Sequence, residues 1–250
     1  MLIKFLSSLD SKILLLSVLS ILPWAFFLFV LQPSSNGRKF FISFCAFGLG
    51  ILSTQFILYL HPILWPEVNF KPKKATSMLS QTVYISFIQA GMMEETFKES
   101  FILFLSLVTG FDFKEKKFHK DVILIGAFVA LGFACVENYV YIAKDNIKIV
   151  DMFLGRTFYS SNIHLLINLC FALFLLKTNT SSEKLILILY GYFLAVMQHG
   201  IVDFFLLPGS RFGNWLSTAF FVGIWVWVVR DLRKYVYTEE TTDLQAESIL

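Results

Sequence analysis

Long runs of apolar residues, separated by short polar segments, dominate the chain. A transmembrane helix needs roughly 20 mostly apolar residues, and six of the runs are close to that length. They lie at 13–31, 40–60, 122–142, 158–176, 185–207 and 214–229. The pattern therefore predicts an all-α fold, a polytopic membrane helix bundle, in which no loop is long enough to hold a separate domain.

A further apolar segment, 75–111, is interrupted by a charged group at 94–99. As one straight helix it would be roughly 55 Å long at 1.5 Å per residue, which exceeds the thickness of a bilayer core. Two short crossings that meet near Gly91 fit better, and a re-entrant 75–93 is the alternative. We therefore expect eight transmembrane helices, or seven with a re-entrant 75–93.

The basic residues indicate how these helices are oriented. With eight crossings, the amino terminus, the Lys71–Lys74 group, the Lys114–Lys120 group and the polar tail 231–250 all lie on one side. Cytoplasmic loops of membrane proteins carry the excess of Lys and Arg. This side is therefore predicted to be cytoplasmic, with both termini on it.

Composition supports a membrane protein and excludes several other classes. The chain is 56% hydrophobic and only 16% charged, whereas soluble domains average about 45–50% and about 25%. Its three cysteines lie inside apolar runs, which excludes a disulfide scaffold. No nucleic-acid module is recognisable. We expect a multi-pass protein of the cell inner (plasma) membrane, whose partner is the lipid bilayer and not nucleic acid.

Polar residues inside the predicted helices are the candidates for function. An ionisable group at the centre of a membrane helix costs at least about 2.5–3.5 kcal/mol. The candidates are Glu94, Glu95, Lys98, Glu137, Asn138, His164, Asn168, His199 and Asp203. With 1.5 Å per residue, the four segments that carry them place them within roughly 12 Å of the outer boundary. Such a shared depth indicates one site.

Helical spacing predicts which way some of these side chains face. Glu137 follows Gly126, Ala130 and Ala134 on one stripe, and small residues at this spacing indicate close helix packing. His199 and Asp203 are four residues apart, as are Glu94 and Lys98, so each pair can interact.

The residue types suit direct activation of water. A desolvated glutamate can act as a general base near neutral pH, and a histidine opposite can stabilise an oxyanion. Lys98 would balance the charge. The sequence lacks a serine nucleophile with a nearby histidine at a strand-to-helix turn, and it lacks a His-Glu-x-x-His motif. We expect peptide-bond hydrolysis with no cofactor and no metal.

These residues resemble a known family. Glu94-Glu95-Thr-Phe-Lys98, then Gly132 to Tyr139 around Glu137-Asn138, then Arg156 with His164, and His199 to Asp203 resemble the motifs of the PrsW family, in this order. These are glutamic-type intramembrane proteases related to the CAAX prenyl endopeptidases. The resemblance covers about 91–203.

The resemblance implies a function and a set of roles. It implies an endopeptidase that cleaves a single-pass membrane protein near the outer face, as in regulated intramembrane proteolysis of an anti-sigma factor. The chain would be one membrane domain, 1–250, with a protease-like core at about 75–207 and a cytoplasmic tail at 231–250. The catalytic candidates are Glu94, Glu95, His164, His199 and Asp203, supported by Lys98, Glu137 and Asn138.

Two other functions use the same residues. Glutamate, histidine and aspartate are all zinc ligands, so a zinc-dependent membrane hydrolase is the first alternative. Carboxylates in a membrane also form ion paths, so a proton-coupled transporter is the second.

Overall fold

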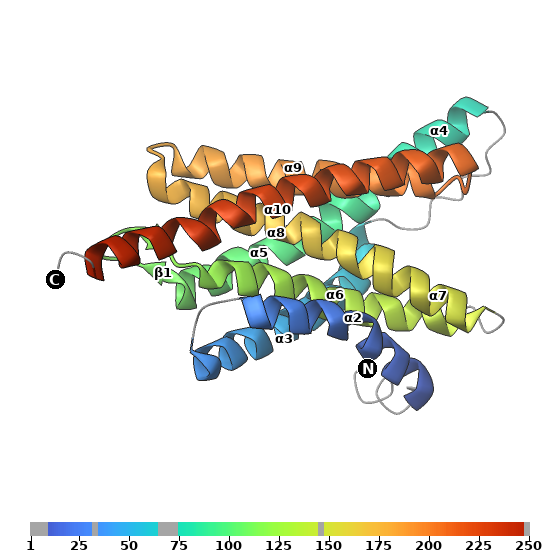
Figure 1. Ribbon diagram of the computed structural model, residues 1–250. Helices are drawn as coiled ribbons and strands as arrows, with labels where there is room; N and C mark the ends of the chain where they lie inside the picture. The colour runs from blue at the N-terminus through green and yellow to red at the C-terminus, as the bar shows by residue number, and fades with distance from the viewer. Residues whose placement is uncertain (1–9, 32–34, 65–74, 145–147, 248–250) are drawn as a thin grey trace.

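A computed structural model describes residues 10–31, 35–64, 75–144 and 148–247 (Figure 1). The elements are α2 (Ser11–Leu31), α3 (Asn36–Leu64), α4 (Ala75–Val83), the π-helix η1 (Tyr84–Met92), α5 (Met93–Thr109), β1 (Phe111–Asp112), β2 (Lys117–Phe118), α6 (Asp121–Lys144), α7 (Ile149–Gly155), the π-helix η2 (Arg156–Ser160), α8 (Ser161–Lys177), the 3-10 helix η3 (Thr178–Thr180), α9 (Lys184–Leu206) and α10 (Arg211–Glu247).

The described chain forms an elongated bundle of helices, and this confirms the predicted all-α membrane architecture. Six helical segments are long and apolar enough to cross a membrane: Ser11–Val30, Asn36–Leu64, Asp121–Lys144, Ile149–Thr180, Lys184–Leu206 and Arg211–Lys234. Each contains one of the six runs predicted from hydropathy, to within a residue or two at its ends. The polar tail continues α10 as far as Glu247.

Helices α6 and α8 form the centre of the bundle. Most of their side chains are buried, from Val122 to Cys135 in α6 and from Ile163 to Leu176 in α8. Helices α2, α3, α5, α9 and α10 surround them (Figure 1). A polar side chain within these buried stretches, such as His164, therefore meets protein instead of lipid.

The segment 75–109 does not reverse at Gly91, contrary to the prediction of two short crossings. It runs antiparallel to α9 throughout: Thr96 contacts Tyr192, Gly91 approaches Val196, and Phe87 contacts Phe204. The length argument assumed a straight helix along the membrane normal. Here nine residues of the segment are π-helical, and a helix that is too long for the bilayer can tilt or kink.

The segment 75–109 passes through the bundle once, whereas two crossings were predicted. The two ends of the described chain therefore do not lie on the same side, which the prediction required. Asp10 donates its backbone N–H to Tyr139, late in α6, whereas Asp231 of α10 pairs with Lys177 at the end of α8. The two ends of the described chain thus lie at opposite ends of the bundle (Figure 1). Eight crossings with both termini cytoplasmic are therefore not confirmed. The Lys71–Lys74 group lies outside the described residues.

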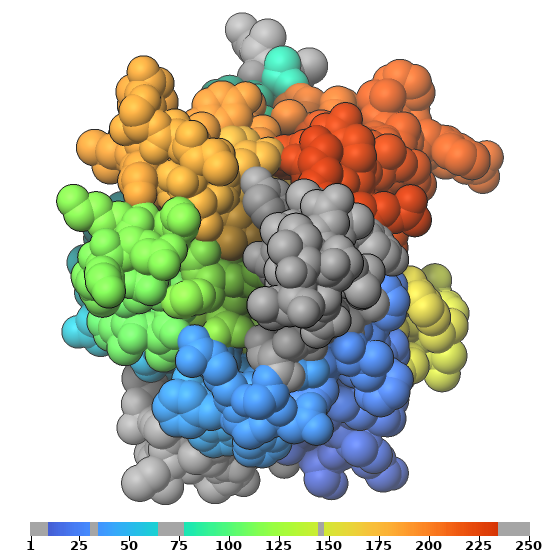
Figure 2. All heavy atoms as spheres, turned by 60° about the vertical axis from the view of Figure 1, so that its left-hand side comes forward, coloured from blue at the N-terminus to red at the C-terminus, as the bar shows by residue number. Residues whose placement is uncertain are grey.

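The strands β1 and β2 form a short antiparallel hairpin that marks one end of the bundle, which we call the hairpin end. The backbone N–H of Phe118 donates to Asn179 Oδ1, and the carbonyl of Phe118 accepts from Asn179 Nδ2. Lys184 Nζ donates to the carbonyl of Lys116. Figure 2 shows this end, with the green hairpin region beside the orange start of α9. The other end, where 207–210 joins α9 to α10, is called the turn end.

Helices α3 and α6 cross closely at two glycines. A Cβ atom on Gly50 would overlap the carbonyl oxygen of Val129, and one on Gly132 would overlap that of Phe47. Small residues at a helix contact let two backbones approach in a membrane, where packing replaces the hydrophobic effect as the driving force. The predicted motif residue Gly132 therefore contributes to packing.

We expect Gly50→Ala to lower the free energy of unfolding by about 1–3 kcal/mol, because the added methyl group forces α3 away from α6. Gly48→Ala is the matched control, since it lies two residues away on α3 with no atom within 4 Å of its added Cβ. Unfolding of both variants in mixed micelles would be measured. Equal stability of the two variants would contradict this packing.

Candidate active site

A cavity of about 640 Å³ lies between η1 and α5, α6, η2 and α8, and α9. Five of the predicted site residues line it: Glu94, Glu137, His164, His199 and Asp203. The structure thus brings together the four segments that sequence depth had grouped.

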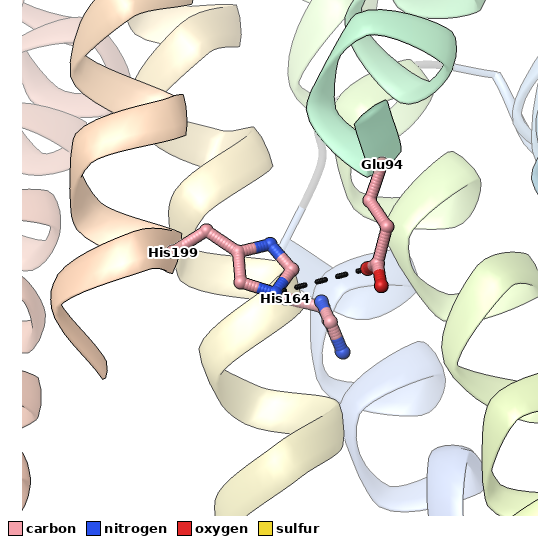
Figure 3. Close-up of side chains that lie close together, drawn as sticks. All are labelled: Glu94, His164 and His199. Carbon is pink, nitrogen blue, oxygen red and sulfur yellow. Dashed lines mark ion pairs between the residues drawn. The ribbon is translucent and has the colours of Figure 1, made fainter. Parts of the chain in front are cut away.

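Glu94, His164 and His199 point towards one another from three helices, α5, α8 and α9 (Figure 3). Glu94 Oε2 lies 3.7 Å from His199 Nε2, and the two imidazole centroids are 5.3 Å apart. Oε2 of Glu94 is buried and has no hydrogen-bond partner among the described residues. Lys98 Nζ lies 3.8 Å from the same oxygen, and the Glu94 side chain as a whole is 18% exposed and lines the cavity.

Glu95 does not line the cavity and is completely buried. Its Oε1 lies 2.5 Å from both Lys98 Nζ and His199 Nδ1, and its Oε2 accepts a 3.0 Å hydrogen bond from Asn168. Lys98 is also completely buried, with its ammonium 4.3 Å from the centroid of the Phe133 ring. A cation, a carboxylate and an imidazole thus form a chain, Lys98–Glu95–His199, that fixes the His199 ring.

A second chain of the same kind holds the other histidine. Arg156, the first residue of η2, bonds to Glu137 Oε2, and the same oxygen lies 2.8 Å from His164 Nε2. Nδ1 of His164 lies 3.3 Å from Lys98 Nζ. In contrast to Lys98, Arg156 lines the cavity.

Asn138 supports this second chain from outside the cavity. It accepts a 2.6 Å hydrogen bond from Arg156 Nε and donates to the hydroxyls of Ser20 and Ser161. It therefore ties α2, α6 and α8 to the segment that carries Arg156.

Asp203 lies one helical turn beyond His199, nearer the turn end. Its Oδ2 is 3.4 Å from His199 Nε2, and its side chain is 30% exposed. The predicted interaction between these two residues is present.

Sequence reasoning missed Glu99 and underrated Asn168 and Arg156. Glu99 is 3% exposed and accepts a 2.9 Å hydrogen bond from the same Asn168 amide that bonds to Glu95. Its position four residues after Glu95, on the same helical face, was the signal that could have found it.

The same three residues could hold a metal ion. One donor atom each from Glu94, His164 and His199 lie within 4.8 Å of one another. Each histidine has a carboxylate on one ring nitrogen, which is how proteins orient histidine ligands. Lys98, however, already brings a positive charge to within 3.3 Å of His164 Nδ1.

The fold and the site define a polytopic membrane protein with the carboxylate and imidazole groups that hydrolases use on water. The chain belongs to the PrsW family, because the sequence model described as "PrsW family intramembrane metalloprotease" matches residues 40–229. This confirms the resemblance found in the motifs and indicates a membrane-embedded peptide hydrolase.

Curated relatives are similar along most of the chain. Protease PrsW of Clostridioides difficile (strain 630) is 27% identical over 161 residues, which are 63% of this chain and 66% of that protein. Protease PrsW of Bacillus subtilis (strain 168) is 26% identical over 210 residues, 82% of this chain and 88% of that protein. The Oceanobacillus iheyensis protein of the same name is 28% identical over 191 residues, which are 75% of this chain and 80% of that protein. No solved structure gives a significant match.

Proposed function

We propose that this chain is an intramembrane endopeptidase of the plasma membrane that cleaves a single-pass membrane protein, such as an anti-sigma factor. The observation that carries the proposal is the Glu94 carboxylate, which lines a cavity inside a membrane bundle and points towards two histidines (Figure 3). These are the groups that water-mediated cleavage of a peptide bond needs.

Glu94 is the proposed general base. Its side chain lines the cavity and is 18% exposed, so its carboxylate can take a proton from water as that water attacks the scissile carbonyl. Glu95 is proposed to position His199 instead, since its oxygens already bond to Lys98, His199 and Asn168.

His199 is the proposed stabiliser of the oxyanion. Its Nδ1 faces Glu95, so its Nε2 is the nitrogen directed to Glu94 and Asp203. An N–H at that position would stabilise the charge that develops on the carbonyl oxygen. His164 is held by Glu137 and Lys98 and completes the wall opposite.

A metal-dependent variant of this function is the second candidate. The donor types fit, because two histidines and a glutamate form a known catalytic zinc set, and the Glu94 oxygen is unpartnered. Glu94, His164 and His199 would hold the ion, which would supply an activated water. The Lys98 ammonium opposes a second cation at this place, and for this reason we favour direct activation by Glu94.

Cleavage of a single-pass reporter protein in reconstituted bilayers tests the proposal. We expect the purified protein to cleave the reporter, and to keep its activity after chelation and dialysis, with metal content measured on the same sample. Loss of activity that zinc restores would select the metal-dependent candidate. Ion transport without any cleavage would overturn both.

The proposed orientation places the hairpin end in the cytoplasm and the turn end outside. Described basic residues near the hairpin end are Arg38, Lys39, Lys114, Lys116, Lys117, Lys120, Lys177, Lys184, Arg230, Arg233 and Lys234. Fewer described ones lie near the turn end: Lys12, Lys144, Lys148, Arg156 and Arg211. The positive-inside tendency then places the site towards the outer face, as the motifs implied.

Single cysteines at positions 12, 117 and 210 should reveal this orientation in intact cells. We expect Lys117→Cys to be labelled only from the cytoplasm, and Lys12→Cys and Ser210→Cys only from outside. Position 12 decides the point, because eight crossings place it in the cytoplasm. Labelling of Lys12→Cys from the cytoplasm alone would restore the eight-crossing arrangement.

A further inference from the structure

Asp203 differs from the other carboxylates of the cavity wall in having no lysine or arginine within ion-pair distance among the described residues. Lys98 lies near both Glu94 and Glu95, and Arg156 is bonded to Glu137. Asp203 Oδ2 approaches His199, but no described residue bonds to its Oδ1. With 30% of its side chain exposed, Asp203 presents to the cavity a carboxylate whose ion-pair contacts among the described residues are limited to His199.

The walls around Asp203 are mainly apolar. Ile85, Ile163, Val202 and Leu206 line the same cavity. A carboxylate in such surroundings interacts more strongly with a cation than it would in water, because the local dielectric constant is low. An apolar peptide with one positive side chain would match these walls.

The position of Asp203 fixes where that side chain belongs. The cavity is closed at His164 and Ile167, which are buried, and it reaches Tyr141 and Leu207, which are exposed, at the turn end. Asp203 lies four residues beyond His199 in this direction, or about 6 Å along the helix axis. An extended peptide covers that distance in about two residues.

We propose that Asp203 is a specificity-determining residue, which binds a lysine or arginine side chain of the substrate. This side chain lies about two residues from the cleaved bond, on the side towards the turn end. The inference rests on the proposed protease function and names a feature of its substrate.

A set of reporter proteins tests the preference with the unaltered enzyme. The reporters differ at one residue, which is Lys, Met or Glu, placed one, two or three residues from the cleaved bond towards the turn end. At the second position, we expect KM to be about tenfold lower for Lys than for Met, and higher for Glu than for Met. The value of kcat should be similar for all three reporters. The same substitutions on the hairpin-end side of the bond serve as the control and should have no such order.

Binding to an inactive enzyme separates specificity from catalysis. Glu94→Gln enzyme is compared with the Glu94→Gln/Asp203→Asn double variant, and melting is measured in parallel. The measured quantity is the dissociation constant of each reporter. We expect the Lys reporter to lose its tenfold tighter binding relative to the Met reporter in the double variant. It should keep most of this difference when Asp203→Glu replaces Asp203→Asn. If Asp203→Asn does not fold, the Asp203→Glu variant and the reporter series still decide the matter.

Two results would overturn the inference: equal KM values for Lys and Met at all three positions, or a lysine preference that survives in Asp203→Asn. If the unaltered enzyme cleaves the Met reporter, the protease function stands whichever of these two results is found. Failure to cleave any reporter would instead refute the proposed function itself.

Discussion

Replacement of Glu94 by Gln should lower the rate of peptide cleavage by at least about 10²-fold while the protein stays folded. The amide keeps the size of the side chain but cannot take a proton from water. Glu94 Oε2 has no hydrogen-bond partner to lose, and its distance to Lys98 Nζ is already 3.8 Å, so the structural cost is small. Cleavage of the reporter in bilayers and melting of the variant would be measured together.

A matched control distinguishes this effect from a general loss of charge. Glu115→Gln makes the same substitution on the exposed hairpin, where the side chain contacts Lys117 and is remote from the cavity. It should leave both activity and stability unchanged. Full activity of Glu94→Gln at normal protein levels would refute Glu94 as the base.

The membrane helices could be predicted from the sequence because their cause is local. Twenty apolar residues between polar ones suffice for a span, whatever the rest of the fold. The shared depth of Glu137, His164 and His199 followed from the same reasoning, whereas the predicted depth of Glu94 rested on a reversal near Gly91 that the structure does not contain. Once the spans are known, a fixed rise per residue gives the depth of each polar side chain.

The course of 75–109 could not be predicted in this way. Hydropathy counts Glu95 and Lys98 as two costs, whereas in the folded bundle they form a pair 2.5 Å apart with no exposure to lipid. Their partners His199 and Asn168 come from distant helices. Only tertiary contacts reveal that a charged segment can pass through the bundle without turning back.

The separate roles of Glu94 and Glu95 could be predicted only in part. Adjacent residues on a helix point about 100° apart, so the sequence indicates that they differ. Which of them faces the cavity depends on how α5 is rotated against α8 and α9. The structure directs Glu94 to the cavity and Glu95 to Lys98, and this difference leads to opposite expectations for their variants.

Replacement of Glu95 by Gln should destabilise the protein by about 3–5 kcal/mol, the usual cost of breaking a buried ion pair. The neutral amide leaves the Lys98 ammonium without its closest partner in a place that water does not reach. We expect poor expression and a lower melting temperature than for Glu94→Gln. Unfolding in mixed micelles would measure the difference, and equal stability of the two variants would contradict the assignment.

A double variant tests the cause of that loss. Lys98→Met removes the charge that Glu95→Gln leaves unpaired, so the Glu95→Gln/Lys98→Met protein should regain much of its stability. Its activity should stay low, because His199 Nδ1 would no longer face a carboxylate that fixes the ring. Recovery of stability without recovery of cleavage would show that Glu95 both balances a buried charge and positions His199. If the losses of the two single variants simply added, the two residues would not act as a pair.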